Sequence, residues 1–424
     1  MINHKKKYPK YLFLCVLSSK ENSYIKKEEK FCSNTYHPLP VVLSKGKGVF
    51  VWDVHGKKYF DFLSSYSAVN QGHCNRKILN AFLKQSKKLT LTSRAFYNNE
   101  LGNSLEYITS VFGYDKMLPM NSGAEAVEAA LKICRKWGYE VKKVAKNKAK
   151  IIVCNGNFHG RTTTVISFSS SKESKENFGP LTVGFEIIEY NNIQKLNEAF
   201  KKDKNIVGFL VEPIQGEGGV VVPDDGYLMK SKKLCEKYNV LFIADEIQTG
   251  ICRTGKLLAC DHEDVRPDIV ILGKALSGGF YPVSGVLADS KIMGVLKVGQ
   301  HGSTFGGNPL GAVVAKESIK FALSKNLSKN ATEMGILFRE NLENLRTKYK
   351  LIKKIRGKGL LNAIVLDCEE NSKIPWQLSL KMRDNGLLAK PTQGNKIRFA
   401  PPLIINKKQI LKAIKLIDIS FSEL

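Results

Sequence analysis

The chain has 424 residues, of which 66 are Lys or Arg and 39 are Asp or Glu, so its formal net charge is +27. This length exceeds one small core, and a hydrophobic content of 43% is typical of a globular protein rather than a disordered one. The lysines are scattered through helix-like stretches, as at Lys142 and Lys143, without interleaved aromatic residues. We therefore interpret the excess charge as solvated surface and expect no nucleic-acid partner.

The nine cysteines are odd in number and lie far apart, without a CxxC or Cys/His metal-ligand spacing. This usage is typical of reduced thiols in a reducing compartment, and we expect no bound metal. No apolar run approaches the length of a membrane span, so no membrane partner is expected either.

The N-terminal residues 1–17 combine three lysines at 5–7 with a short apolar run at 11–17. The pattern superficially resembles a signal peptide, but the apolar run is short and no clean small-residue cleavage site follows it. Glu28 and Glu29, flanked by lysines, are not typical of a transit peptide. We expect a cytoplasmic extension, with the mitochondrial matrix as the less favoured location.

Two short segments near the N-terminus, 49–53 and 57–63, alternate between apolar and polar side chains, and the His-Gly pair at 55–56 favours a turn between them. This pattern predicts a small antiparallel meander. Tyr36 and Tyr66 flank the meander, and from the sequence alone both are most simply structural aromatic residues.

An apolar run at 117–120 leads into Ser122, Gly123 and Ala124, and a helical pattern follows over 127–137. Small residues with free backbone N–H groups at a helix N-terminus can bind an anion without a charged side chain. The simpler interpretation is that Ser122 only caps the helix. The sequence leaves both interpretations open.

The apolar run at 151–154 indicates another buried strand, and polar residues follow it. Phe158 is one of the next residues, and an aromatic side chain at a strand end can stack on a planar ligand. Arg161 follows closely, and a guanidinium suits a bidentate contact with a carboxylate.

Five other polar residues would by themselves indicate ordinary surface. Glu212 and Glu217 lie in a glycine-rich turn after an apolar run, and Ser303 and Thr304 lie in a loop rich in glycine and hydroxyl groups. Arg398 lies in a strand-like run before a double proline. A solvated loop or strand is the simple interpretation for each of them.

The stretch 240–285 is the most informative part of the chain. One apolar run ends in Asp245, and a second run leads to Lys274 in a glycine-rich turn. Ligands of open α/β sheets bind at the carboxyl ends of the strands, so this carboxylate and this amine are expected at one crevice. Pyridoxal phosphate requires such a pair, since it needs an amine for a Schiff base and a carboxylate that keeps its pyridine nitrogen protonated. A surface lysine after a strand is the alternative.

The run ADEIQTG at 244–250, followed by GKALSGG at 273–279, resembles the core of the ω-aminotransferase group of class III pyridoxal-phosphate enzymes. Within that group the chain is most similar to the ornithine aminotransferase family, from about Tyr36 to near Pro402. One departure is His159, where we expect tryptophan in the animal members of the family.

The resemblance implies a coenzyme site for pyridoxal phosphate. Lys274 would hold the coenzyme, Asp245 would stabilise its pyridinium, and Gln248 would lie near its phenolic oxygen. The other implied coenzyme residues are the phosphate cradle Ser122, Gly123 and Ala124, the ring-stacking Phe158 and Ile247, the supporting Glu212, and the loop residues Ser303 and Thr304. In this family the equivalent of Thr304 reaches the coenzyme phosphate of the neighbouring subunit, which implies a homodimer with shared active sites.

The resemblance also implies five substrate-binding residues. Tyr36 and Arg161 would bind the α-carboxylate of ornithine, and Tyr66 would shape the pocket. Arg398 would clamp the α-carboxylate of glutamate. Glu217 would pair with this arginine and swing away when glutamate binds.

The implied fold is α/β, a fold type I PLP-transferase with a mostly parallel, doubly wound central sheet. We expect an N-terminal extension and β-meander over residues 1–66, a large coenzyme-binding domain over 67–318, and a small C-terminal α/β domain over 319–424. Within the last of these, the pattern predicts a helix over 331–349 and a strand over 362–366.

The implied activity is transfer of the δ-amino group of L-ornithine to 2-oxoglutarate, which gives glutamate 5-semialdehyde and L-glutamate. A sister enzyme that acts on N-acetylornithine or 4-aminobutyrate would share all the coenzyme residues, and Tyr36 and Tyr66 are expected to distinguish the two. A basic nucleic-acid-binding protein on an inactive enzyme fold is the remote alternative, which steeply salt-dependent binding would reveal.

Overall fold

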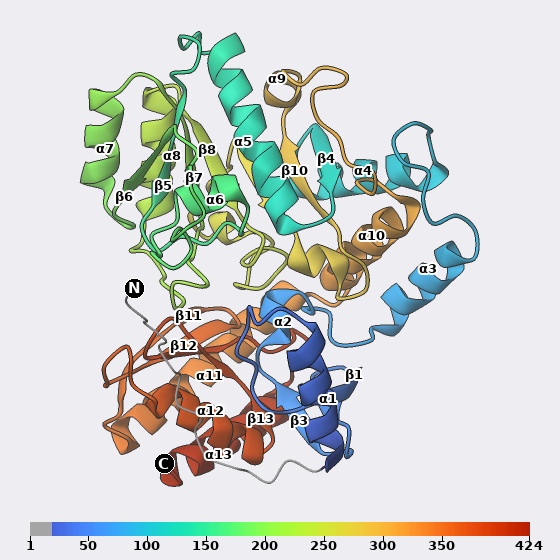
Figure 1. The fold of residues 1–424 in the computed structure, drawn as a ribbon, viewed down its shortest axis with the longest axis vertical. Coiled ribbons are helices and arrows are strands. Elements are labelled where there is room, and N and C mark those ends of the chain that lie inside the picture. The colour runs from blue at the N-terminus through green and yellow to red at the C-terminus, as the bar shows by residue number, and fades with distance from the viewer. Residues whose placement is uncertain (1–18) are drawn as a thin grey trace, which may run out of the picture.

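The computed structural model describes residues 19–424, which form two parts (Figure 1). The upper part contains a seven-stranded sheet with helices around it, and the lower part contains two four-stranded sheets. The basic and apolar segments at 5–17 lie outside the described residues. No helix within the described range is both long and apolar enough to cross a bilayer.

The seven-stranded sheet has the spatial order β4 (Lys116–Met120), β10 (Ser284–Ala288), β9 (Ile269–Leu272), β8 (Leu241–Asp245), β7 (Ile206–Val211), β5 (Lys150–Cys154) and β6 (Phe185–Ile188). From β9 to β6 all neighbouring strands run parallel, and β10 runs antiparallel to both β9 and β4. The prediction of a mostly parallel central sheet is confirmed.

The helices of the upper part are α3 (Arg76–Ser86), α4 (Asn99–Phe112), α5 (Gly123–Glu140), α6 (Thr163–Ser167), α7 (Ile193–Lys202), α8 (Tyr227–Lys237), α9 (Ser290–Met293) and α10 (Pro309–Ser324), with short 3₁₀ turns η1 (Ala259–Glu263) and η2 (Lys274–Ser277). They cover both faces of the sheet. Along β8, Leu241 and Ile243 pack in the same core as α5, whereas Phe242 and Ala244 pack with α7 and α8. Burial on both faces explains the continuous apolar runs from which the strands were predicted.

The lower part contains a sheet of β1 (Leu43–Lys47), β2 (Phe50–Asp53), β3 (Lys58–Asp61) and β13 (Leu387–Leu388), and a sheet of β11 (Ile352–Lys358), β12 (Leu361–Leu366), β15 (Lys396–Phe399) and β14 (Lys390–Thr392). Its helices are α1 (Ser19–Phe31), α2 (Ser64–Ser67), α11 (Leu327–Lys348), α12 (Ile374–Asp384) and α13 (Lys407–Ser422). The predicted N-terminal meander is confirmed as β1–β3, and the predicted C-terminal helix and strand are confirmed as α11 and β12.

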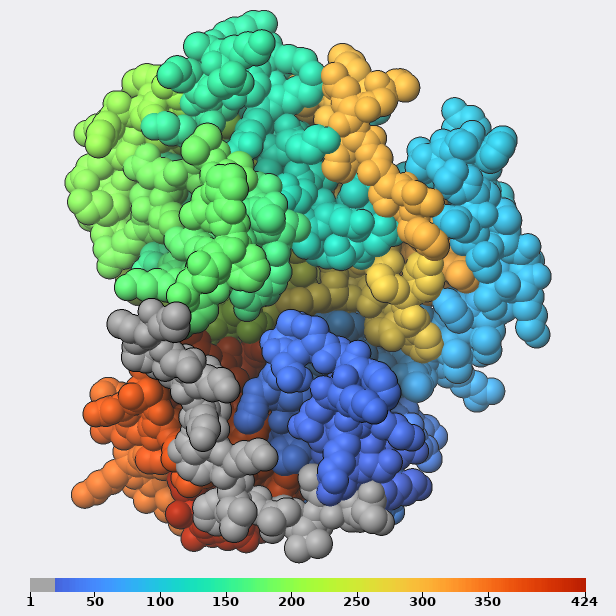
Figure 2. Space-filling model, in the orientation of Figure 1, coloured from blue at the N-terminus to red at the C-terminus, as the bar shows by residue number. Residues whose placement is uncertain are grey.

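The N-terminal meander is completed by the other end of the chain. Strand β13 pairs parallel to β3, so residues near both ends of the described chain share one sheet. Figure 2 accordingly shows the blue N-terminal and red C-terminal segments together in the lower part. The sequence gives no indication of this pairing, because β13 has two residues and too little length for a periodic pattern.

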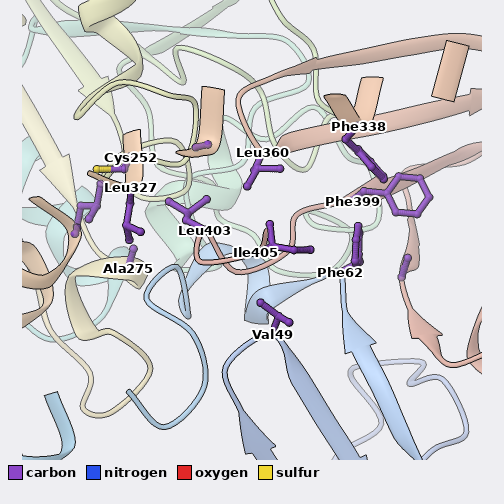
Figure 3. Close-up of a cluster of buried hydrophobic side chains, with 14 of the residues drawn as sticks. Val49, Phe62, Cys252, Ala275, Leu327, Phe338, Leu360, Phe399, Leu403 and Ile405 are labelled. Carbon is purple, nitrogen blue, oxygen red and sulfur yellow. The ribbon is translucent and has the colours of Figure 1, made fainter. Parts of the chain in front are cut away.

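One apolar core connects the two parts, and Figure 3 shows a portion of it. It brings together Val49 and Phe62 from the N-terminal meander, Cys252 and Ala275 from the segments after β8 and β9, and Phe399 from β15. Segments that are far apart in the sequence therefore depend on the same buried contacts.

Arg253 connects three of these segments by hydrogen bonds. Its fully buried guanidinium donates to the carbonyl oxygens of Leu360 at 2.9 Å and Pro401 at 2.6 Å, and to Oδ1 of Asn70 at 2.5 Å. Buried polar atoms are strongly destabilising when they lack a partner. One side chain thus satisfies acceptors from the N-terminal segment, the loop before β12 and the C-terminal segment.

Replacing this side chain should destabilise the protein. Arg253→Leu leaves three buried acceptors without a donor, and we expect the free energy of unfolding to fall by about 3 kcal/mol or more in a urea titration. The matched control is Arg346→Leu, because Arg346 is about half exposed and pairs with Glu343 on the surface of α11. This control should change the free energy by less than about 1 kcal/mol. Equal stability of Arg253→Leu and the wild type would contradict the interpretation.

Candidate active site

The carboxyl ends of four parallel strands bring the predicted residues to one edge of the sheet. Strand β5 is followed by Phe158, β7 by Glu212 and β9 by Lys274, while β8 ends in Asp245. Since the strands are parallel and adjacent, these side chains share the same crevice. The structure therefore places Asp245 and Lys274 at the carboxyl edge of the sheet, as the sequence predicted.

The surroundings of Lys274 lower the pKa of its amine well below the ordinary value. Burial lowers the pKa of its amine to about 8, although the negative charge of Glu217 opposes this shift. Its backbone has a φ of +40°, in the left-handed region that non-glycine residues rarely adopt. An amine with this pKa can both accept and release a proton near neutral pH.

Asp245 is buried and held by two hydrogen bonds. The Nδ1 atom of His159 lies 2.6 Å from its Oδ2 atom, and the backbone N–H of Ile247 donates to Oδ1 at 3.1 Å. Burial alone would lower the pKa of His159, but the contact with Asp245 more than offsets it and the pKa is raised. The carboxylate of Asp245 therefore favours the protonated form of the His159 ring.

The role of His159 was not predicted. The sequence marked it only as a departure from the family pattern, and nothing in its spacing indicates a contact with a carboxylate 86 residues later. Its second ring nitrogen, Nε2, is buried and has no hydrogen-bond partner among the described residues. The one available clue was its place in the polar loop after β5, five residues past the end of the strand.

Glu212 connects the loops on either side of it rather than facing the cavity. Its carboxylate accepts from the backbone N–H of Phe158 at 2.9 Å and of Gly216 at 3.3 Å. Burial raises its pKa to about 7. Glu212 therefore holds the loop after β5 against the turn after β7.

The N-terminus of α5 combines a helix cap with free backbone donors. Ser122 Oγ accepts from the N–H of Glu125, whose carboxylate accepts in turn from the N–H groups of Asn121 and Ser122. This capping box leaves the N–H groups of Gly123 and Ala124 without a partner among the described residues. The cap and the anion site are therefore compatible at one helix end.

A separate loop approaches the same helix end. Asn121 donates from Nδ2 to the hydroxyl of Ser303 at 2.8 Å. The neighbouring Thr304 is exposed to solvent.

Glu217, Gln248 and Arg398 form a hydrogen-bonded cluster in which Gln248 and Arg398 are buried and Glu217 is partly exposed. The Nη1 atom of Arg398 donates to Glu217 at 2.7 Å and to Gln248 Oε1 at 2.9 Å, and Gln248 Nε2 donates to Glu217 at 3.2 Å. Burial would raise the pKa of Glu217, but the charges of Arg398 and Lys274 lower it below its ordinary value. The pair is consequently charged at neutral pH. The guanidinium also lies 4.9 Å from the centre of the Tyr66 ring.

A cavity of about 620 Å³ opens beside this cluster. Its lining includes the predicted Tyr66, Phe158, Arg161, Glu217 and Arg398, together with Lys390, which the sequence did not single out. Tyr66 lies in a turn over 64–67 in which every φ is positive, and such strain is concentrated at functional sites.

Two predicted substrate residues are less enclosed than the others. Tyr36 is 78% exposed and is not among the residues that line the cavity. Arg161 is exposed and donates to Ser174 Oγ at 2.9 Å. Only Arg161 of these two faces the cavity directly.

The comparisons with known proteins agree on one family. The model of the family "Aminotransferase class-III" matches residues 31–419. The mitochondrial ornithine aminotransferase of Drosophila melanogaster is 56% identical over 391 residues, which cover 92% of this chain and 89% of that protein. The crystal structure of ornithine aminotransferase from Toxoplasma gondii ME49 superimposes with a TM-score of 0.93 at 47% identity and covers 96% of both chains. Acetylornithine aminotransferase from Elizabethkingia anophelis gives 0.88 at 56% identity, over 95% of this chain and 99% of that one.

The lowered pKa of Lys274 gives a test that needs no substrate. Below pH 8 the amine is mainly protonated and unreactive, and above it the neutral amine is nucleophilic. Labelling of the apo protein by acetic anhydride at this residue should therefore rise with a midpoint at about pH 8, as measured by peptide mass spectrometry. The Lys274→Met variant identifies the peptide signal. Labelling that rises only near pH 10 would show that the amine is not desolvated.

Proposed function

We propose that this chain, which belongs to the class-III aminotransferase family, is an ornithine δ-aminotransferase. It would transfer the δ-amino group of L-ornithine to 2-oxoglutarate, giving glutamate 5-semialdehyde and L-glutamate. The observation that carries the proposal is the partly buried Glu217–Arg398 pair, which lies in the cavity wall and interacts electrostatically with Lys274. The names of the similar proteins from Drosophila and Toxoplasma support it.

Class III aminotransferases use pyridoxal phosphate, and the residues at the strand ends suit this coenzyme. The buried Lys274 amine would attach it, Asp245 would face its pyridine nitrogen, and the free N–H groups of Gly123 and Ala124 would bind its phosphate. Phe158 and Ile247 would contact the two faces of the ring, with Ser122, Glu212, Gln248, Ser303 and Thr304 completing the site. When bound, the coenzyme supplies a ring that withdraws electrons from the substrate carbon.

The protein's own residues would supply the proton chemistry. Lys274, with its pKa of about 8, can accept a proton from the substrate carbon and return one to the coenzyme. Asp245 would keep the ring nitrogen protonated, and His159 positions its carboxylate through the contact between Nδ1 and Oδ2. The burial of these groups strengthens their interactions, because water screens them little.

One pocket must handle two different amino groups. Ornithine offers its δ-amine, with its α-carboxylate far from the ring, whereas glutamate offers its α-amine, with that carboxylate close to the ring. A free Arg398 would favour binding of ornithine by its α-amine, which leads to the wrong reaction. Glu217 lies 2.7 Å from Arg398 and can neutralise it during the ornithine half-reaction. It would swing away when glutamate or 2-oxoglutarate binds.

The far end of the pocket would bind the α-carboxylate of ornithine. We assign this contact to Tyr36 and Arg161, with Tyr66 shaping the space between them and the ring. Arg161 lines the cavity, and the hydroxyl of Tyr36 is close enough to Tyr66 to influence its pKa. Since Tyr36 is 78% exposed, it would have to move or become covered when ornithine binds.

We also propose a homodimer in which Thr304 reaches the coenzyme phosphate of the other subunit. Phe96, Tyr97 and Val298 are strongly exposed, and large apolar patches commonly mark protein interfaces. In Figure 2 the light-blue and orange segments that contain them project on the right of the upper part. Thr304 lies in the same stretch of chain as Val298. Sedimentation equilibrium of the holo protein measures the state directly.

The cellular location and the domain limits are part of the proposal. We favour the cytoplasm because Glu28 and Glu29 do not suit a transit peptide, although the Drosophila relative is named mitochondrial. Microscopy of the tagged protein would distinguish the two compartments. We also retain the division into residues 1–66, 67–318 and 319–424, which limited proteolysis would test at the two boundaries.

An activity on N-acetylornithine has one observation in its favour. The similar protein from Elizabethkingia anophelis is named acetylornithine aminotransferase and is 56% identical over 95% of this chain. The coenzyme residues cannot distinguish the two substrates. Turnover of ornithine, N-acetylornithine and 4-aminobutyrate under the same conditions decides between the activities.

Visible spectra of the holo protein test the function itself. Ornithine alone should change the coenzyme absorbance, and 2-oxoglutarate should restore it. Lys274→Ala should lower turnover at least about a thousandfold, because the group that moves the proton is lost. The control is Lys353→Ala, since Lys353 pairs with Asp367 on the surface of the lower part. A spectrum unaffected by ornithine would refute the proposed activity.

The gate is tested by removing its carboxylate. In Glu217→Ala, Arg398 is free throughout, so the glutamate half-reaction should hold or speed up while the preference for the δ-amine of ornithine falls. Breaking a partly buried ion pair costs a few kcal/mol at most, which corresponds to roughly a ten- to a few hundred-fold loss of preference. Stopped-flow absorbance measures each half-reaction, and the exposed Glu369→Ala is the control. Equal losses in both half-reactions would instead indicate a structural role.

A further inference from the structure

Three cationic residues lie on one face of the hairpin formed by β14 and β15. The strands are antiparallel, with Lys390 paired to Arg398 and Thr392 paired to Lys396. Directly paired residues of antiparallel strands project from the same face, and alternate residues share that face. Thr392 donates from its hydroxyl to the carbonyl of Glu217, so this face is turned toward the cavity.

Two of these three cations have carboxylate partners. Arg398 pairs with Glu217 at 2.7 Å, and Lys396 pairs with Glu370 at 3.2 Å. The side-chain amine of Lys390 has no hydrogen bond or ion pair with any residue in the described range. It lines the cavity in a half-buried position, and burial lowers the pKa of its amine.

An unpaired cation at this position is unfavourable for the protein alone. The side chain of Lys390 projects from the same face of the hairpin as Arg398. Burial imposes a desolvation cost on its amine that no carboxylate of the described chain offsets. An anionic ligand in the cavity would remove this penalty. The arrangement therefore indicates that Lys390 serves binding rather than stability.

We propose that Lys390 is a specificity-determining residue that binds a carboxylate of the amino acceptor, the dicarboxylate 2-oxoglutarate. This inference rests on the proposed function, and it concerns how the two substrates are distinguished. The acceptor carries two carboxylates and no ammonium group. Ornithine carries one carboxylate and two ammonium groups, so a permanent cation attracts the first substrate and repels the second.

The position of Lys390 suits the acceptor when the gate is open. Arg398 would take one carboxylate once Glu217 has moved, and Lys390 lies directly across the hairpin from it. Side chains in such a pair begin about 5 Å apart, and both are long and flexible. Arg161 lines the same cavity, so the acceptor meets cations on more than one wall.

Binding of a dicarboxylate that cannot react tests the inference without turnover. Glutarate should bind the holo protein in isothermal calorimetry, and Lys390→Met should weaken it by about ten- to a hundredfold, as expected for a lost charge-assisted contact. Methionine retains the aliphatic stem, and Lys390→Gln serves as a second variant. Lys390→Arg should bind glutarate within about threefold of the wild type, because the charge is kept.

Steady-state kinetics then separate binding from structure. In Lys390→Met the KM for 2-oxoglutarate should rise by about the same factor, whereas the KM for ornithine should stay constant or fall. The control is Lys354→Met, since Lys354 is an exposed residue of β11 in the same sheet. Unchanged glutarate binding, or an equal rise in both KM values, would overturn the inference. A wild-type protein that binds glutarate but shows no spectral response to ornithine would instead refute the proposed function.

Discussion

The geometry of the candidate active site depends on the register between β8 and β9. Asp245 of β8 lies opposite Ile271 of β9, and Lys274 follows three residues after Ile271, just past the end of β9. The backbone N–H of Glu246 donates to the carbonyl of Ile271 at 3.1 Å and extends this pairing past the end of β8. A slip of one residue would displace the carboxylate by about 3.3 Å relative to the amine. Hydrogen bonds of the backbone therefore set the separation of the two groups on which the chemistry relies.

Burial then gives the groups at this edge different ionisation behaviour. For Lys274 and Glu212, desolvation outweighs the opposing charges and hydrogen bonds and moves the pKa values to about 8 and about 7. Glu217 is only partly exposed, but the charge of Arg398 outweighs its desolvation and lowers its pKa, so the carboxylate stays charged. The site thus combines groups that exchange protons near neutrality with a pair that stays charged. A proton carrier and a stable electrostatic gate require this difference.

The sequence predicted the parts of the site that follow from local pattern. Continuous apolar runs identified the parallel strands, and the rule that ligands bind at their carboxyl ends placed Asp245 and Lys274 together before any coordinates were known. The sequence did not predict contacts between residues that are far apart in the chain. His159 meets Asp245 only through the order of the strands, and Lys390 meets the cavity only through the pairing of β14 with β15. Neither partner can be read from residues that are neighbours in the chain.

The paired cations Arg398 and Lys390 explain how one cavity can treat two substrates differently. The charge of Arg398 is conditional, because Glu217 lies 2.7 Å from it and neutralises it until the carboxylate moves. The charge of Lys390 is not neutralised by a carboxylate of the described chain. A conditional cation can distinguish where a carboxylate lies along the substrate, whereas an unpaired one distinguishes the total charge of the substrate. The two requirements of the reaction, the correct amino group and the correct partner, therefore fall on neighbouring residues of one hairpin.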